Sequence, residues 1–246
     1  MRNTHRLLIA VAITLTSLLG QAFPTLTGPT GLGNIPTADV VPKGLFGGAV
    51  TWLNSKDSDA GIKDTYPIGV LYGIAKHAEI GAAYWAQDGN TAWTLNGKYV
   101  TPLKLAGADW AVGAQYLDFT DADVKITQAY FVGARTLTAA DAAIPVRLHA
   151  GVNWSNIDLP GSGHDNFLRG IFGVDATIAK KLTIGADYQT RKSDWEQKPG
   201  YSLVARYAIA PRVIGQLGVS NAPIFGGEDA KAFAGVLYVF KGPDND

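Results

Sequence analysis

From residue 45 onward, apolar and polar residues alternate along the chain in short segments that are separated by turn signals. The clearest segment places five apolar residues on one face: Val146, Leu148, Ala150, Val152 and Trp154. The residues between them are polar or small: Arg147, His149, Gly151, Asn153 and Ser155. A period of two predicts β-strands with one apolar face and one polar face. The chain contains twelve such segments: 45–54, 65–74, 78–87, 91–100, 107–118, 124–137, 145–156, 165–178, 182–190, 200–209, 213–221 and 231–240.

Aromatic residues on the apolar face gather near the two ends of these segments. One group lies near the expected outer ends of the strands: Trp52, Tyr66, Tyr84, Trp93, Tyr116, Trp154, Tyr188 and Tyr201. The other group lies near the expected inner, periplasmic ends: Phe46, Tyr72, Tyr99, Trp110, Tyr207, Tyr238 and Phe240. A soluble β-sandwich buries such rings between its sheets, whereas an outer-membrane barrel carries them as two girdles at the lipid boundaries. We therefore predict an all-β fold, a transmembrane antiparallel β-barrel of twelve strands formed by residues 45–240.

The connections between the segments alternate in length. Turns after even-numbered segments are mostly short, as at 75–77, 179–181 and 210–212. Connections after odd-numbered segments are mostly longer: 55–64, 157–164, 191–199 and 222–230. Outer-membrane barrels have short periplasmic turns and long external loops. Both ends of the barrel are thus expected in the periplasm, with residues 241–246 as a periplasmic tail.

The N-terminus has the three-part form of a secretory signal peptide. Arg2 and Arg6 precede an apolar run, 7–19, and residues 20–22 are suited to cleavage. A membrane-spanning helix needs about 20 apolar residues, so this run is too short to be one. We predict that residues 1–22 are removed on the way to the bacterial outer membrane.

The last segment resembles the C-terminal signal that barrel-assembly machinery recognises in outer-membrane proteins. The resemblance rests on Gly235, followed by the aromatic residues Tyr238 and Phe240. It implies two partners, the barrel-assembly machinery and the lipid of the outer membrane.

Composition excludes several classes of function. The chain has no cysteine, and therefore neither a disulfide framework nor a thiolate metal site. Its 21 basic and 21 acidic residues balance, so it lacks the basic excess of a protein that binds nucleic acid. Two groups of aspartates in external loops match no calcium-loop spacing, and we expect no metal and no cofactor. These groups are Asp57, Asp59 and Asp64, and Asp118, Asp121 and Asp123.

Residues 23–44 lie between the signal peptide and the first strand, and their glycines and prolines preclude a regular helix. Gly31-Leu32, residues 35–38 and residues 42–44 form an arrangement similar to the N-terminal motif of YjbH-type outer-membrane proteins. That family is associated with exopolysaccharide production and export, and its members are much longer. The resemblance implies an outer-membrane location and a role connected with polysaccharide. Residues 23–44 either rest on the periplasmic rim or enter the lumen, where Asn34 and Asp39 are positioned to bond to the wall.

The polar faces predict a set of residues that line the lumen and contact solutes or one another. The charged and main polar members are Lys98, Asp109, Gln115, Lys125, Arg135, Arg147, His149, Asn153, Arg169, Asp175, Asp187 and Arg206. Further members are Glu79, Gln87, Asn96, Gln189 and Gln216. Opposite charges that pair would stabilise and obstruct the interior. Unpaired bases would instead favour the passage of anions.

Catalysis is not expected. His149 and Ser155 lie six residues apart on one strand, about 20 Å at the usual rise, which is too far for proton transfer. We predict a porin-like channel for small hydrophilic solutes. The alternative is a non-conducting accessory barrel associated with exopolysaccharide production or export.

Overall fold

The computed structural model describes residues 23–54, 64–87, 90–137, 144–161, 163–179, 181–191, 199–221 and 230–242. The predicted signal peptide, the last four residues of the predicted tail, and Asp57 and Asp59 lie outside the described residues. Within the described ranges, no helix has the length and apolarity needed to cross a membrane.

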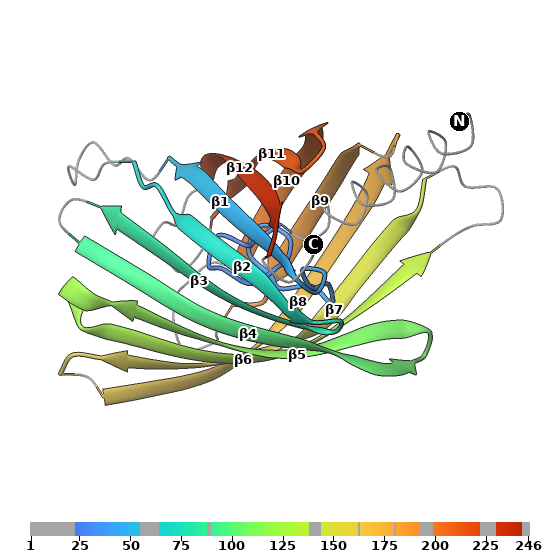
Figure 1. The fold of residues 1–246 in the computed structure, drawn as a ribbon. Coiled ribbons are helices and arrows are strands. Elements are labelled where there is room, and N and C mark those ends of the chain that lie inside the picture. The colour runs from blue at the N-terminus through green and yellow to red at the C-terminus, as the bar shows by residue number, and fades with distance from the viewer. Residues whose placement is uncertain are drawn as a thin grey trace, which may run out of the picture.

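Twelve antiparallel strands close into a barrel, as the alternating pattern predicts (Figure 1). Each strand pairs with its neighbours in the sequence, and β1 pairs with β12 to complete the ring. Closure leaves no unpaired backbone edge, which a barrel in lipid requires. The strands are β1 Leu45–Leu53, β2 Ile68–Ala75, β3 Ala78–Gln87, β4 Asn90–Leu105, β5 Ala108–Phe119, β6 Val124–Leu137, β7 Val146–Leu159, β8 Gly163–Ile178, β9 Leu182–Gln189, β10 Gly200–Ala210, β11 Val213–Ser220 and β12 Lys231–Lys241.

Strand β4 extends five residues past the predicted segment, which ended at Val100. The extension contains Pro102, which lacks a backbone donor. The pairing of β4 with β5 shifts register between Thr101 and Leu105, and this irregularity accommodates the proline within the hairpin.

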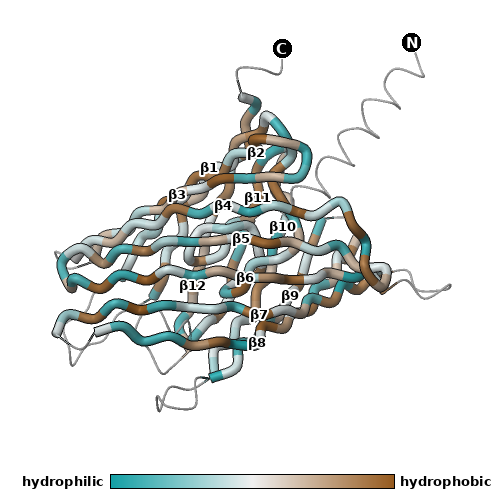
Figure 2. Tube along the Cα trace, turned by 90° about the horizontal axis from the view of Figure 1, so that it is seen from below, coloured by the Kyte–Doolittle hydropathy of each residue, from teal (hydrophilic) through white to brown (hydrophobic). Residues whose placement is uncertain are grey.

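The outer face of the barrel is apolar. Large side chains that are exposed on it include Val70, Ile80, Leu95, Leu148, Leu168, Ile184, Leu203, Leu217 and Val236. Aromatic residues assigned to the two girdles share this face, as the exposed side chains of Tyr84, Tyr99, Tyr188 and Tyr238 show. Figure 2 shows hydrophobic and hydrophilic residues alternating along the strands. An apolar outside on a closed barrel is suited to lipid.

Three strands meet at the closing seam through stacked aromatic rings. The register places Phe46 of β1 opposite Phe240 of β12 and opposite Tyr72 of β2. The ring of Phe46 stacks on that of Tyr72 at 4.2 Å and on that of Phe240 at 5.4 Å. Tyr238 continues the stack at 6.2 Å from Phe240. Two aromatic residues of the proposed assembly signal thus lie at the joint between the first and last strands.

Residues 23–44 lie inside the barrel, where Figure 1 shows them as a blue trace enclosed by the strands. Apolar side chains of this segment, which we term the lumen segment, pack on apolar residues of the wall. Phe23 packs in a cluster with Ala49, Ile214, Leu237 and Val239. Leu26 packs with Leu53, Val204 and Phe233, and Val41 packs with Leu71. The largest cluster joins Leu32, Ile35 and Ala38 to Ala111, Tyr130, Val132, Ala134 and Ile171.

Candidate functional site

The lumen segment is folded on itself by backbone hydrogen bonds. The amide of Gly31 donates to the carbonyl of Phe23 at 3.0 Å, and the amide of Thr37 donates to that of Thr30 at 3.2 Å. Gly33 lies against the wall so closely that a Cβ there would be 2.1 Å from Oγ of Ser202. A compact shape and a glycine at the point of closest approach let the segment fit within the ring of strands.

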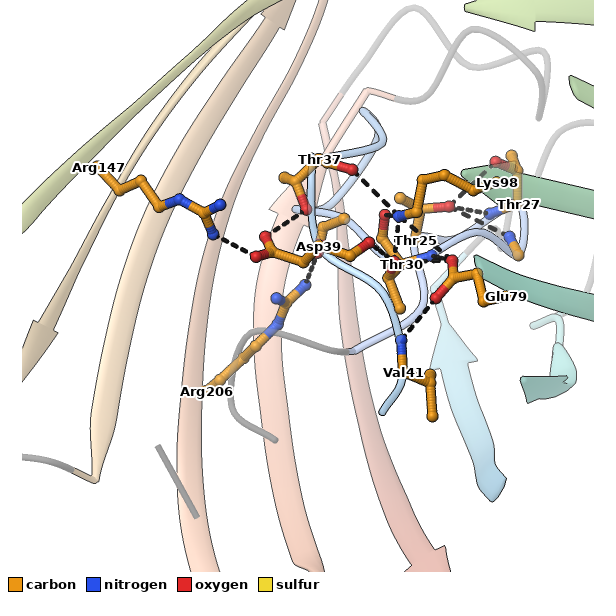
Figure 3. Close-up of polar contacts among 12 residues, drawn as sticks. Thr25, Thr27, Thr30, Thr37, Asp39, Val41, Glu79, Lys98, Arg147 and Arg206 are labelled. Carbon is orange, nitrogen blue, oxygen red and sulfur yellow. Dashed lines mark hydrogen bonds and ion pairs between the residues drawn. The ribbon is translucent and has the colours of Figure 1, made fainter. Parts of the chain in front are cut away.

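Glu79 of β3 and Lys98 of β4 hold the segment from one side (Figure 3). Oε1 of Glu79 accepts a hydrogen bond from the amide of Thr30 at 3.0 Å, and Oε2 accepts one from the amide of Val41 at 2.8 Å. Nζ of Lys98 lies 3.2 Å from Oε1 of Glu79 and donates to the carbonyls of Thr30, at 2.8 Å, and Thr37, at 3.1 Å. Both charged side chains are fully buried. Their charges are compensated by each other and by backbone groups of the segment, which a buried pair requires.

Arg147 of β7 binds the only described acidic side chain of the segment, that of Asp39, within the lumen. A guanidinium nitrogen of Arg147 donates to Oδ1 of Asp39 at 2.5 Å, and Oγ1 of Thr37 donates to Oδ2 at 2.8 Å. Burial by itself raises the pKa of Asp39, but the charge and hydrogen bond of Arg147 outweigh it and hold the pKa below its usual value. Asp39 is therefore a carboxylate at neutral pH.

Arg206 and Asp187 hold the segment from the opposite wall. A guanidinium nitrogen of Arg206 donates to the carbonyls of Gly31, at 2.7 Å, and Leu32, at 3.1 Å. Oδ2 of Asp187 accepts from the amide of Asn34 at 2.9 Å. The side chain of Asn34 bonds in turn to the carbonyl of Tyr201 at 3.0 Å and to Oγ of Ser220 at 2.7 Å. The two residues expected to bond to the wall, Asn34 and Asp39, both do so.

Ten of the twelve charged and main polar residues predicted in the lumen fall into three groups. Five of them bond to the lumen segment: Lys98, Gln115, Arg147, Asp187 and Arg206. Four are buried in the interior beside it: His149, Asn153, Arg169 and Asp175. Nε2 of His149 lies 2.6 Å from Oδ2 of Asp175. Asp109 lies at the short-turn rim, where it pairs with Lys104 at 3.4 Å and is partly exposed.

Lys125 and Arg135 were predicted in the lumen, and this was wrong. Both are exposed on the outer face near the two ends of β6. The inward positions of this strand carry Ile126, Tyr130, Val132 and Ala134, which pack inside the barrel. The prediction assigned the charged residues of β6 to the lumen face. The faces are the other way round, because this part of the wall packs on apolar residues of the lumen segment and not on water.

Of the additional lumen residues, Glu79, Asn96, Gln189 and Gln216 are buried, and the side chain of Gln87 lies outside the described residues. Several buried polar groups on the wall find no hydrogen-bond partner among the described residues. They include Oη of Tyr130, Oδ1 of Asn153 and the side-chain amide of Asn96. Buried polar atoms are nearly always partnered, often by ordered water. This side of the lumen is thus polar enough to hold water.

The sequence pattern did not reveal the central role of Thr30 in these hydrogen bonds. Its amide and hydroxyl meet Glu79, its carbonyl accepts from Lys98, and its hydroxyl lies 2.7 Å from the carbonyl of Asp39. The recurrence of threonine at positions 25, 27, 30 and 37 was the available signal, since hydroxyls satisfy backbone groups in irregular segments.

No protein-family model matches the chain, and no curated protein sequence is detectably similar to it. Solved structures with the same fold include the KdgM porin in complex with disordered oligogalacturonate. It has a TM-score of 0.56 and 13% identity over 80% of this chain and 99% of that one. The NanC porin has a TM-score of 0.55 and 11% identity over 80% of this chain and 98% of that one.

An outer membrane channel from Pseudomonas putida F1 has a TM-score of 0.51 and 12% identity over 85% of this chain and 100% of that one. At these identities the likeness concerns the fold alone. The chain is a porin-like β-barrel of the bacterial outer membrane.

Proposed function

We propose that this porin-like barrel is sealed by its own lumen segment and works as a non-conducting accessory protein of the cell envelope. The observation that carries the proposal is the position of residues 23–44, which bond to opposite walls of the barrel at once. Glu79 and Lys98 bind the segment on one wall, and Arg206 binds it on another. A passage for solutes would have to open between these contacts.

Apolar packing supports a permanent seal. Phe23 and Ile35 have no exposed surface, and the wall residues Val132, Ile171 and Leu237 are equally buried beneath the segment. A porin lumen is lined by polar groups in contact with water. Withdrawal of the segment would expose these apolar surfaces on both sides and leave buried charges without partners.

The polysaccharide role that we propose rests on the segment itself. The residues similar to the YjbH-type motif include Gly31, Leu32, Ile35 and Thr37, and the same residues make contacts inside the barrel. The motif thus has a structural task in sealing the lumen. We propose that the sealed barrel assists exopolysaccharide production or export. Deleting the gene in its own host and measuring envelope polysaccharide tests this role, and unchanged polysaccharide would contradict it.

A channel for small hydrophilic solutes is the second candidate, and one observation favours it. The polar groups of Asn96, Tyr130 and Asn153 that find no partner among the described residues belong to β4, β6 and β7, and buried groups of this kind often bond to ordered water. Water between the lumen segment and this part of the wall would mark the place where a narrow passage forms if the segment shifts.

Single-channel recording on the refolded mature protein in planar bilayers separates the two candidates. We expect no conductance steps from the sealed barrel. A matched protein, in which Asp39→Cys and Arg147→Cys are joined by a short bifunctional thiol reagent, fixes the segment, and the absence of native cysteine makes this link unambiguous. Steps in the unmodified protein that disappear on linking would establish the channel and overturn the seal.

A further inference from the structure

The two ends of the barrel differ in charge. At the end with the long connections, the described acidic residues outnumber the basic ones. The acidic residues there are Asp64, Asp118, Asp121, Asp123, Asp158 and Asp165, and the basic ones are Lys125, Arg191 and Lys231.

The short-turn end is basic instead. Its exposed bases are Lys43, Lys76, Arg135, Lys181, Arg212 and Lys241, which we term the basic rim. Lys104 also lies there and pairs with Asp109, whose side chain is partly exposed. Lys180, Asp141, Asp244 and Asp246 follow in the same connections and lie outside the described residues.

The basic rim runs around the barrel instead of forming one patch. Its residues come from the approach to β1, the β2–β3, β8–β9 and β10–β11 turns, the end of β6 and the end of β12. Aromatic residues of the short-turn end lie nearer the centre of the membrane than the rim does, as Trp110 does relative to Arg135. Aromatic rings of this kind mark the lipid headgroup boundary. The rim therefore stands at the level of the headgroups of the periplasmic leaflet.

We propose that the basic rim binds the anionic headgroups of phospholipids in the periplasmic leaflet of the outer membrane. Bases at a membrane surface attract anionic lipid, and a ring of them meets lipid from every direction. A single acidic polymer chain would instead need bases gathered in one continuous patch. The proposal does not depend on whether the lumen is sealed, because Lys76, Arg135, Lys181 and Arg212 of the rim lie outside the contacts that hold the lumen segment.

Electron spin resonance of spin-labelled lipids around the refolded mature protein tests the proposal. We expect phosphatidylglycerol to be preferred over phosphatidylcholine by roughly two- to three-fold. The preference should fall toward equality in about 1 M NaCl, where screening shortens to about 3 Å. A variant with Lys76→Gln, Arg135→Gln, Lys181→Gln and Arg212→Gln should lose it, while Lys125→Gln, Arg191→Gln and Lys231→Gln at the other end should retain it.

Three results would overturn the proposal. The first is equal association of the two lipids with the unmodified protein, and the second is an equal loss in both variants. The third is tight binding of polygalacturonate to the protein in detergent, lost in the rim variant, without any lipid preference, because the partner would then be an acidic polymer. If the fourfold variant does not fold, the single variants Lys181→Gln and Arg212→Gln and the salt dependence of the unmodified protein give the same decision.

Discussion

Glu79 and Lys98 face each other across the β3–β4 pairing, and their side chains form an ion pair of 3.2 Å with no exposed surface. Each also bonds to the backbone of the lumen segment. The wall and the segment are thus joined through the same two charges, and neither side chain has an alternative partner in water.

Replacing Lys98 by methionine is expected to destabilise the barrel, because the carboxylate of Glu79 remains buried without its cation. Breaking such a pair costs about 3–5 kcal/mol. Urea unfolding of the refolded protein, followed by tryptophan fluorescence, measures the change. The matched control is Lys104→Met, which removes an exposed pair with Asp109 and should change little. Similar losses in the two variants would show that burial of the pair is not what matters.

The contact between Asp39 and Arg147 predicts a dependence on pH. The pKa of Asp39 is lower in the folded protein than its usual value of 3.8, so its contribution to stability is complete above that value. It is lost as the pH falls through the lower folded value. Asp39→Asn should therefore be less stable than the unmodified protein at neutral pH, and the difference should shrink as the pH falls below 3.8 and disappear below the folded pKa. A difference that persists unchanged in acid would contradict the ion pair, because the other carboxylates are common to both proteins.

Gly33 should tolerate no side chain. Its Cβ would lie 2.1 Å from Oγ and 2.6 Å from Cβ of Ser202, so Gly33→Ala should destabilise the segment by about 1–3 kcal/mol. Proteolysis of residues 23–44 in the refolded barrel reports whether the segment remains seated. Gly33→Ala combined with Ser202→Gly should recover part of the loss. Gly97→Ala is the control, since its Cβ would make one ordinary contact, at 3.9 Å. An equal effect without recovery would exclude the steric explanation.

The aromatic seam should matter most for closure. Phe240→Ala removes stacking on Phe46, and each such pair contributes about 0.5–1.5 kcal/mol beyond its burial. We expect a smaller folded fraction and slower refolding, measured by the heat-dependent migration of the barrel in gels. Phe172→Ala is a suitable control, because this ring is also exposed to lipid but lies on β8, far from the seam in the strand order. Equal slowing by both variants would assign the effect to lost apolar surface alone.

The barrel itself could be predicted from the sequence because its two faces meet different solvents. The residues that face the lumen were harder to predict. The apolar inward residues of β6 look like lipid-facing residues, and only the packing of Val132 on the lumen segment explains them. A period of two identifies two faces of a strand but does not state which one faces inward. The lumen segment is partly apolar, so the rule that polar residues face the lumen does not hold where the wall packs on it. Thr30 and Glu79 lie 49 residues apart in sequence, and no local pattern joins them.

The wall recognises the lumen segment largely through its carbonyls and amides. Arg206, Lys98 and Gln115 all donate to backbone oxygens, and Glu79 accepts from backbone nitrogens. These polar groups of the wall therefore recognise the path of the chain more than the identity of its side chains. The apolar side chains of the segment are still needed for packing on the wall, while its glycines and prolines keep the path. Relatives of this protein should then share a spaced set of glycines and prolines near the start of the mature chain, even where the strands have diverged beyond recognition.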